Sequence, residues 1–397
     1  MAESRWRKYE LEVTPEMIEG VEHYNAVTTT GNFIDDRGRF WSQERTDDYL
    51  PSLRTGLQIQ WTYSKFCNFS CVQCFNGSSP TWRGTEADAF VVSDRFVEAK
   101  PYNVCLCGGE PLTWKPFFPI VEKLRSGGIP LVSTVTNGYL CTPDKVKRMW
   151  DVGLTHLQFS LDGFTAEQFK ELRLKEDGFE KLVAAVKEAV KYDWPDLSVS
   201  FTPTKNNVHD WKNFCRYWAD VGVKHIRTQP FMPIGRGKGA IDLVPSDEQY
   251  QRFHMDTTEL LSELPHAFVD WGDPLEHMWY YTRTAATPWG LGVQTDGWYE
   301  LSCYIPVLVG NSLEHSIEEL WAKDYKRLWN APIVRRFADE MIDMAGMSRL
   351  ALPIYDEPSL HIDVFDDEQL EVFLTTDDLP TLRAISDRNL DEGYRNH

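Results

Sequence analysis

Between residues 56 and about 240 of this 397-residue chain, short apolar runs alternate with longer segments in which apolar residues recur every three or four positions. Short apolar runs bounded by turn residues are typical of buried strands, and the longer spacing is typical of amphipathic helices. In one helical segment, residues 164–191, the positions that can share a face are Phe169, Leu172, Leu182, Val186 and Val190. The six predicted strands are residues 57–62, 103–107, 130–136, 156–161, 197–204 and 225–230.

Strand followed by helix, repeated about six times, predicts a parallel sheet with right-handed crossovers. We therefore assign the chain to the α/β class, as an open or partial (β/α)6 TIM-like barrel with a small α+β C-terminal extension. In that extension the pattern predicts a helix at residues 246–264, a hairpin around Asp296-Gly297 and a helical stretch at residues 316–329.

The two ends of the chain differ from the alternating region. Residues 1–55 are polar, with a hairpin predicted around residues 35–38, and are interpreted as an accessory segment. From residue 351 onwards there are twelve acidic and three basic residues, which indicates a solvated face or partial disorder. The predicted division is an accessory segment (1–55), a core domain (56–240), a C-terminal domain (241–350) and an acidic tail (351–397).

Composition and charge restrict the function. No apolar run approaches the roughly 18 residues of a membrane span, and the first residues are mixed polar sequence, so we expect a cytoplasmic protein without membrane contact. The formal charge of -19, with no concentration of basic residues, argues against a nucleic-acid partner. Eight cysteines scattered over 397 residues do not form the dense framework of a disulfide-stabilised domain, which favours a reducing compartment.

Three of the cysteines form a Cys-x3-Cys-x2-Cys motif at Cys67, Cys71 and Cys74, just after the first predicted strand. The loops after strands are where parallel α/β proteins place their active sites. Three thiolates can hold three corners of a cubane iron-sulfur cluster and leave one iron open, whereas a structural zinc site has four protein ligands. Zinc remains an alternative, with Cys105 or Cys107 as a distant fourth ligand.

Later strand ends also carry glycine and polar residues. The second strand ends in Gly-Gly-Glu, where two glycines allow a close backbone approach and Glu110 adds a charge able to meet an ammonium group. Asn-Gly and Asp-Gly, which end the third and fourth strands, are common turn sequences when they stand alone. The residues concerned are Gly108, Gly109, Glu110, Asn137, Ser160 and Asp162.

The cysteine motif followed in order by these strand ends resembles the radical S-adenosylmethionine (SAM) enzymes. The resemblance implies a 4Fe-4S cluster on Cys67, Cys71 and Cys74, whose open iron is chelated by the amino and carboxylate groups of SAM. It also implies that the Gly-Gly-Glu motif receives the methionine amino group. Reductive cleavage of SAM would then yield a 5'-deoxyadenosyl radical that removes hydrogen from a substrate, with the electron supplied by a donor such as flavodoxin or ferredoxin.

The same resemblance implies further SAM contacts. Ser160 would contact the ribose or methionine part, Asn137 would lie near the cofactor, and Arg173 would meet its carboxylate. Residues 233–236 resemble the family's Pro-x-Gly-Arg segment. One departure is that the family often has an aromatic residue before the third cysteine, where this chain has Gln73. The remaining implied cofactor-binding residues are Phe75, Asp162 and, against adenine, Ile234.

Residues 292–321 resemble the C-terminal extension called SPASM, or its shorter twitch form. That extension usually supplies several cysteines to auxiliary clusters, but Cys303 is the only cysteine after Cys215. We therefore expect no auxiliary cluster, and we interpret Cys303 as a packed residue rather than a hydrogen donor.

The substrate is predicted less directly. With no auxiliary cluster and no convincing peptide-recognition domain in residues 1–55, we favour a small polar metabolite, as in natural-product biosynthesis. One alternative is modification of a ribosomally made peptide. The non-enzyme alternative is a zinc or iron-sulfur binding module.

Overall fold

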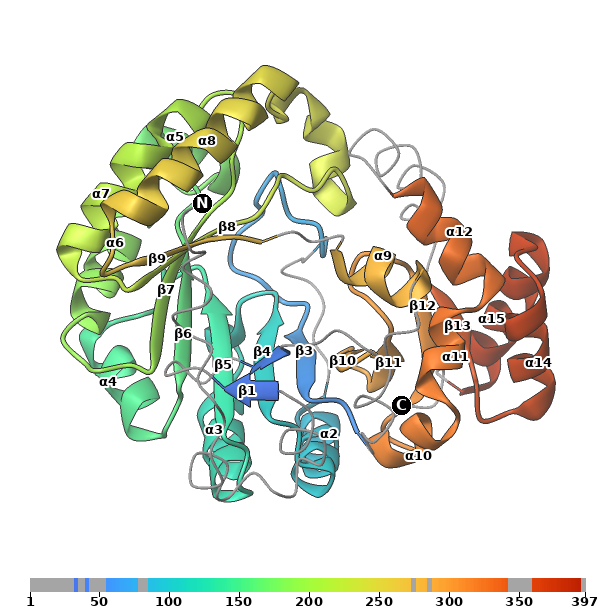
Figure 1. The fold of residues 1–397 in the computed structure, drawn as a ribbon. Helices are drawn as coiled ribbons and strands as arrows, with labels where there is room; N and C mark the ends of the chain where they lie inside the picture. The colour runs from blue at the N-terminus through green and yellow to red at the C-terminus, as the bar shows by residue number, and fades with distance from the viewer. Residues whose placement is uncertain are drawn as a thin grey trace.

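A computed structural model describes residues 32–34, 40–42, 55–77, 85–272, 276–283, 288–341 and 359–393. These residues contain a two-stranded sheet and an 11-stranded sheet with the order β13-β12-β11-β10-β3-β4-β5-β6-β7-β8-β9 (Figure 1). The strands are β1 (Asn32–Ile34), β2 (Phe40–Ser42), β3 (Gln58–Ser64), β4 (Asn103–Gly108), β5 (Leu131–Thr136), β6 (His156–Ser160), β7 (Asp196–Phe201), β8 (His225–Thr228), β9 (Phe268–Trp271), β10 (Gly290–Val293), β11 (Trp298–Glu300), β12 (Val307–Asn311) and β13 (Leu360–Ile362).

Helices connect these strands and cover the sheet. The α-helices are α2 (Glu86–Ala99), α3 (Phe117–Ser126), α4 (Pro143–Asp151), α5 (Ala166–Arg173), α6 (Gly178–Ala189), α7 (Trp211–Val221), α8 (Asp247–Glu263), α9 (Glu276–Arg283), α10 (Ile317–Ala322), α11 (Tyr325–Trp329), α12 (Pro332–Glu340), α14 (Asp367–Thr375) and α15 (Leu379–Gly393). The 3-10 helices are η4 (Pro111–Thr113), η5 (Val208–Asp210) and η6 (Gly235–Leu243).

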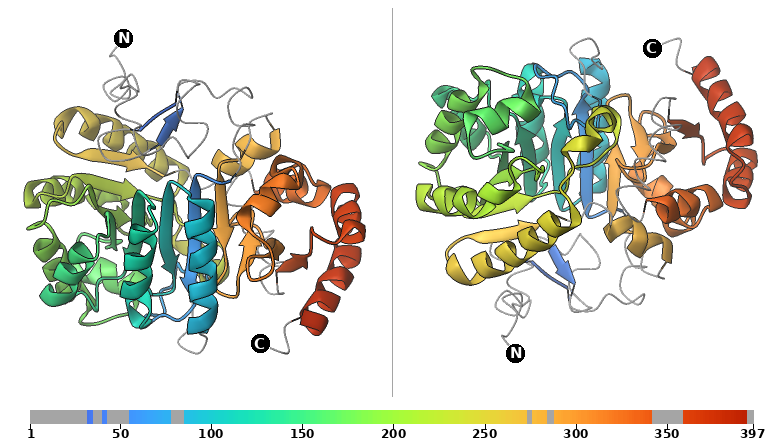
Figure 2. Two further views of the ribbon diagram at one scale, coloured as in Figure 1. Left: turned by 90° about the horizontal axis from the view of Figure 1, so that it is seen from below. Right: turned by 90° about the horizontal axis from the view of Figure 1, so that it is seen from above.

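The six predicted strands are confirmed as β3 to β8, which lie in sequence order and pair in parallel. The intervening helices lie on one side of the curved sheet, as in a partial barrel (Figure 2). β9 adds a further parallel strand beside β8, which the sequence pattern did not reveal. At the other edge β10 pairs in parallel with β3, so the C-terminal extension continues the barrel sheet.

Side chains alternate along the barrel strands. On β3 the residues Ile59 and Trp61 are fully buried in the hydrophobic core, while Gln58 and Gln60 line a cavity on the other side of the strand. Successive side chains of a strand point to opposite faces of the sheet, so the apolar set packs on the helices and the polar set faces inward. The barrel therefore has a polar interior.

Two other predicted features are confirmed by strand pairing. β1 and β2 form the antiparallel N-terminal hairpin, with Phe33 opposite Trp41, although its turn lies outside the described residues. The second hairpin is β10–β11, where Gly297 has the positive φ of 87° that glycine tolerates.

Two stretches predicted as continuous helical patterns are interrupted in the structure. Residues 164–191 contain α5 and α6, separated at Leu174, which has a left-handed φ of 53°. Residues 316–329 contain α10 and α11, separated at Asp324 with a φ of 58°. The apolar spacing survives both breaks, which is why periodicity alone did not reveal them. The helix predicted at 246–264 is confirmed as α8, which Ser246 caps.

The acidic tail is folded where the structure describes it. Residues 359–393 form β13, which pairs in parallel with β12, and the helices α14 and α15. Partial disorder was therefore the wrong alternative for these residues. The solvated-face alternative agrees with the exposed Asp367 and Glu368 in the first turn of α14.

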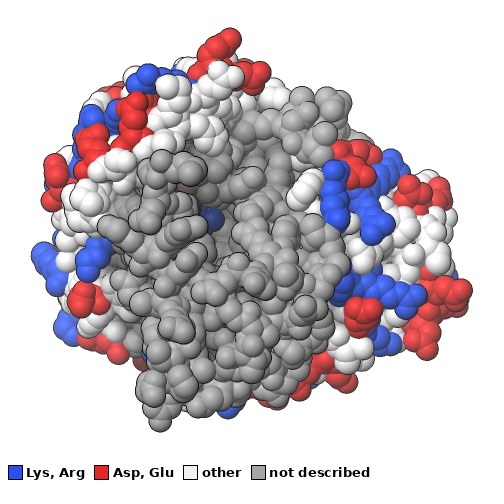
Figure 3. Space-filling view, in the orientation of Figure 1, with Lys and Arg blue, Asp and Glu red and all other residues white. Residues whose placement is uncertain are grey.

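The surface shows acidic and basic side chains interspersed over the outer helices at the edges of the face in Figure 3. In the described part of the chain, none of the helices has the length and apolar character needed to cross a bilayer.

Candidate functional site

The barrel interior holds a cavity of about 500 Å³ at the ends of the parallel strands. Its walls come from the cysteine loop after β3, from the strands β3 to β8, and from the segment that follows β11. The sequence-predicted residues that line it are Cys67, Cys71, Cys74, Phe75, Gly108, Gly109, Asn137, Ser160, Asp162 and Arg173. Glu110 and Ile234 do not line it.

The cysteine loop is held by polar contacts to its sulfur atoms. Asn137 Nδ2 lies 3.9 Å from Cys67 Sγ, and the backbone N–H of Phe69 donates to the same sulfur at 3.4 Å. Arg173 Nη1 lies 3.6 Å from Cys71 Sγ. Burial raises the pKa of Cys67 to about 12 and also raises that of Cys71. Both thiols are therefore neutral in the metal-free protein, and metal binding would release their protons.

The two glycines of the Gly-Gly-Glu motif allow the end of β4 to contact the cysteine loop directly. A Cβ atom on Gly109 would lie 2.0 Å from the carbonyl oxygen of Phe66, and one on Gly108 would lie 2.4 Å from that of Ser64. The backbone N–H of Glu110 donates to Phe66 O at 2.8 Å. Any larger residue at either glycine would push the two segments apart.

The carboxylate of Glu110 contacts groups at the end of the neighbouring strand. Its carboxylate is fully buried and accepts hydrogen bonds from Thr136 Oγ1 at 2.8 Å and from the backbone N–H groups of Asn137 at 2.7 Å and Leu112 at 3.2 Å. Burial raises its pKa, and these hydrogen bonds oppose the rise. The carboxylate thus joins the ends of β4 and β5, and its contact with an ammonium group stays a prediction.

Asp162 and Arg173 form a buried ion pair at the cavity wall. Asp162 follows β6 with a left-handed φ of 59°, and its other carboxylate oxygen accepts from Thr202 Oγ1 at 3.0 Å. Gln73 Nε2 donates to Asp162 Oδ2 at 2.7 Å. The residue that departs from the family pattern therefore ties the cysteine loop to the end of β6, which sequence reasoning missed.

The Pro-x-Gly-Arg segment covers the other side of the cysteine loop. A Cβ atom on Gly235 would lie 2.3 Å from Phe75 O. Arg236 donates from its backbone N–H to Cys74 O at 3.0 Å and from Nε to Cys71 O at 2.9 Å. The side chain of Ile234 is fully buried in the core, so the expected adenine contact through it is not supported.

The inner wall contains residues that sequence reasoning gave no role or a different one. Cys303, which we expected to be simply packed, lines the cavity together with Cys105 and Cys107. Burial raises the pKa of Cys303, and it raises the pKa of Glu300 to about 7. The polar residues at alternate positions along the strands were the sequence signal that could have identified the lining residues on those strands. The further polar or aromatic lining residues are Gln58, Gln60, Gln158, Ser200, Arg227, Gln229, His277, Tyr281 and Tyr304.

The C-terminal extension closes the cavity beside the cysteine loop. The ring of Phe75 packs against that of Tyr304, with centroids 5.6 Å apart. Gln229 Nε2 on the barrel side donates to the Tyr304 hydroxyl at 3.0 Å. Barrel and extension therefore build one site, and Phe75 is a contact between them.

The donor set fits an open iron-sulfur cluster. Three thiols of one loop border a single cavity, and glycines keep side chains out of the two contacts that position the loop. Within the ranges that the structure describes, no three His, Cys, Asp or Glu side chains, the three loop cysteines included, lie close enough together to hold a metal ion. Binding of a metal or cluster would therefore bring the three sulfur atoms closer together.

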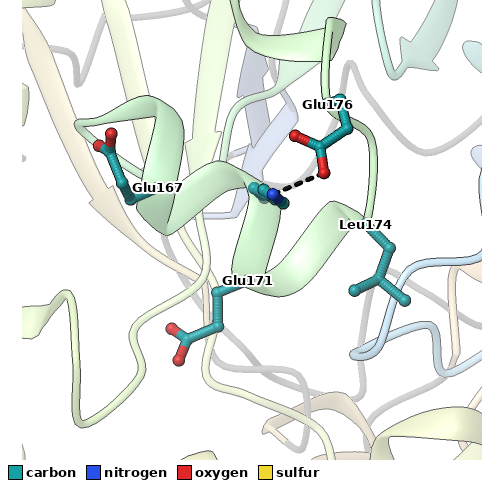
Figure 4. Close-up of a pocket in the computed structure, with 5 residues that line it drawn as sticks. Glu167, Glu171, Leu174 and Glu176 are labelled. Carbon is teal, nitrogen blue, oxygen red and sulfur yellow. Dashed lines mark ion pairs between the residues drawn. The ribbon is translucent and has the colours of Figure 1, made fainter.

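A second depression lies on the exposed side of α5 and is lined mainly by carboxylates (Figure 4). Lys170 forms a 2.5 Å ion pair with Glu176 there, and the side chain of Leu174 is 58% exposed. Among the described residues that line it, the only cation, Lys170, is already paired with Glu176, and the carboxylates do not converge on a common point. We therefore assign this depression no role.

Comparison with known sequences gives consistent matches. A sequence model of the radical SAM superfamily matches residues 61–217. A probable GTP 3',8-cyclase of Metallosphaera sedula is 26% identical over 203 residues, which covers 49% of this chain and 62% of that protein. An AdoMet-dependent heme synthase of Methanosarcina barkeri is 26% identical over 307 residues, which covers 71% of this chain and 84% of that protein. The chain thus spans less than two thirds of the length of the matched cyclase.

Solved structures share the fold. Streptococcus suis SuiB bound to S-adenosylmethionine superposes with a TM-score of 0.56 at 12% identity, over 68% of this chain and 66% of that one. The anSMEcpe structure with bound AdoMet gives a TM-score of 0.56 at 15% identity, over 83% of this chain and 99% of that one. At these identities the similarity establishes the partial barrel architecture.

Proposed function

Because the chain belongs to the radical SAM superfamily, and is therefore an enzyme that uses a 4Fe-4S cluster and SAM, we propose that it abstracts hydrogen from a small polar metabolite. A cluster held by Cys67, Cys71 and Cys74 would supply the electron for reductive cleavage of SAM to methionine and a 5'-deoxyadenosyl radical. The observation that carries the substrate class is the polar inner wall of the cavity, where Gln58, Gln158 and Ser200 offer neutral hydrogen-bonding groups.

The cluster ligands in this proposal are Cys67, Cys71 and Cys74. The loop that carries them is held in place by the backbone contacts of Gly109 and Arg236 described above. Its three thiols must lose their protons on metal binding, since thiolates are the ligands.

The SAM contacts are proposed from the lining of the cavity. Because the Glu110 carboxylate is occupied, the backbone of Gly108 and Gly109 is left to meet the methionine amino group. Arg173 is neutralised by Asp162, but its buried Nε has no hydrogen-bond partner in the described part of the chain and retains a donor for the methionine carboxylate. The remaining proposed contacts are Phe75, Asn137, Ser160 and Asp162.

The domain division and the cellular setting are part of the same proposal. We retain residues 56–240 as the core and 241–350 as a relative of the SPASM or twitch extension, flanked by the accessory segment 1–55 and the acidic tail 351–397. Support comes from β10 to β12, which continue the barrel sheet and bring Cys303 to the cavity. A cytoplasmic location and a flavodoxin or ferredoxin electron donor complete the proposal.

Modification of a ribosomally made peptide is the second candidate. It is favoured by fold similarity to SuiB bound to its precursor peptide SuiA, with a TM-score of 0.54, and to anSMEcpe bound to a peptide, with a TM-score of 0.53. Both comparisons are at 16% identity or less. A peptide would need to enter a cavity of about 500 Å³, which fits one side chain better than a folded segment.

Anaerobic reconstitution followed by detection of 5'-deoxyadenosine tests the proposed function. The wild-type protein should bind about four irons and four sulfides per chain and should form 5'-deoxyadenosine from SAM under reduction. Changing Cys67, Cys71 and Cys74 together to alanine should abolish both. Cleavage that persists in the triple variant, or one zinc per chain in the wild type, would overturn it.

A further inference from the structure

The cavity wall contains an arginine that has no ion-pair partner among the residues that the structure describes. Arg227 lies on β8, five strands from β3 in the sheet order, and lines the cavity. Its guanidinium forms no ion pair or hydrogen bond with the residues that the structure describes, and its Nε is buried. The residue as a whole is only half-buried, so its charge remains accessible from the cavity.

A shortage of acidic residues does not explain the missing partner. The chain contains 60 acidic and 41 basic residues. His225, two positions earlier on the same strand, lies 3.0 Å from Asp196 and 3.8 Å from Asp270. Asp270 is also the register partner of Arg227 on β9, but no ion pair joins these two side chains. Within the described ranges, no carboxylate therefore lies at ion-pair distance from the guanidinium of Arg227.

The fold also makes room for the guanidinium. Gly272 follows β9, and a Cβ atom there would lie 3.2 Å from Arg227 Nε and 3.3 Å from Nη2. Ser200 is the register partner of Arg227 on β7, and Cys105 and Tyr304 lie within electrostatic reach of the guanidinium. Gly272 leaves space beside the guanidinium, and Asp270 on β9 is the carboxylate in register with Arg227.

The other arginines of the cavity already have partners. Arg173 forms an ion pair with Asp162, and Arg236 donates to the carbonyl oxygen of Cys71. Arg227 is therefore a single available positive charge on its part of the wall. A polyphosphate would require several cations, whereas one guanidinium matches one carboxylate with two parallel hydrogen bonds.

We propose that Arg227 binds a carboxylate group of the substrate and so fixes the end of the substrate that does not react. The assignment rests on the proposed function, because it specifies the substrate class of the same cavity: a small polar molecule with one carboxylate. It requires no contact of Arg227 with the cluster or with SAM.

Equilibrium dialysis of the reconstituted protein tests this assignment. The probes are a mixture of N-acetyl amino acids, the matched mixture of their neutral C-terminal amides, and N-acetylphosphoserine amide. The wild type should retain members of the acid mixture over the corresponding amides. Arg227→Gln should reduce that retention by about tenfold or more, as expected for loss of a charge-assisted pair. Arg216→Gln removes the same charge from the exposed face of α7 and should retain the acids as the wild type does.

A second variant keeps the assignment testable if Arg227→Gln does not fold. Gly272→Ala places a methyl group against the guanidinium and should also weaken retention of the acids. Equal retention of acids and amides by the wild type, undiminished retention by Arg227→Gln or by Gly272→Ala, or stronger retention of the phosphoserine probe would each overturn the carboxylate assignment.

The dialysis and the SAM cleavage assay test the role of Arg227 and the proposed function separately. Absence of 5'-deoxyadenosine in the wild-type reaction would overturn the proposed function and leave the dialysis result intact. Normal SAM cleavage without selective retention of carboxylates would overturn only the role of Arg227.

Discussion

The side-chain amide of Gln73 donates a 2.7 Å hydrogen bond to Asp162 Oδ2, the oxygen that also pairs with Arg173. This contact joins the cysteine loop to the end of β6, across 89 residues of sequence. Since Arg173 also approaches Cys71 Sγ, the three side chains couple the position of a proposed cluster ligand to the position of a proposed SAM contact.

We therefore expect Gln73→Leu to weaken SAM binding by about tenfold, because a hydrogen bond to a charged group contributes about 1.5–3 kcal/mol. The dissociation constant of SAM for the reconstituted enzyme measures the effect. Asn206→Leu, which removes an exposed amide bonded to Glu171, is the matched control and should bind SAM normally. Unchanged affinity in Gln73→Leu would show that SAM binding does not depend on the hydrogen bond between Gln73 and Asp162.

The contact between Gly109 and the cysteine loop predicts a defect in cluster assembly. In Gly109→Ala the new Cβ would lie 2.0 Å from Phe66 O, so the loop must move. We expect less iron and sulfide per chain after reconstitution than in the wild type. Gly239→Ala is the control, because a Cβ at that position has no other atom within 4 Å. Equal iron content in both variants would contradict the proposed close packing.

The parts of the structure that sequence predicted are those governed by local or periodic signals. The order of β3 to β8 follows from the repeated strand and helix pattern, and the cysteine loop follows from the spacing of Cys67, Cys71 and Cys74. β9 was missed because it is only four residues long, too short for an alternating pattern to be recognised, and it is stabilised by pairing with β8.

Side-chain direction was the other limit of the sequence. Glu110 follows β4 by two residues, and its carboxylate turns toward the backbone N–H of Asn137 just after β5, a contact that only tertiary structure determines. Cys303 reaches the cavity because β10 pairs with β3 and brings the extension alongside the barrel. Sequence spacing does not reveal pairing between segments more than 200 residues apart.

The buried network of Glu110 predicts a stability defect independent of any ligand. In Glu110→Gln one side-chain position changes from acceptor to donor, and it would face the N–H group of Asn137 or the donors Thr136 and Leu112. Leaving buried groups unpaired costs about 1–3 kcal/mol. We expect the free energy of unfolding of the metal-free protein to fall by that amount in urea titrations. A variant with wild-type stability but impaired SAM binding would instead restore the ammonium-binding role.

Glu300 predicts a pH dependence of stability. Burial raises its pKa from 4.5 to about 7, and Lys65 and Gln294 oppose the rise. A carboxyl group whose pKa is higher in the folded state favours folding fully below its unfolded pKa, and this contribution is lost as the pH rises through the folded value. The free energy of unfolding of the wild-type protein should therefore fall by about 3 kcal/mol relative to that of Glu300→Gln, at 1.36 kcal/mol per pKa unit. The fall should begin near pH 4.5 and be complete above pH 7. Urea titrations of both metal-free proteins at pH 5, 6, 7 and 8 measure the difference. Parallel curves would show that Glu300 titrates as an exposed glutamate does, and that the inner wall is open to water at that point.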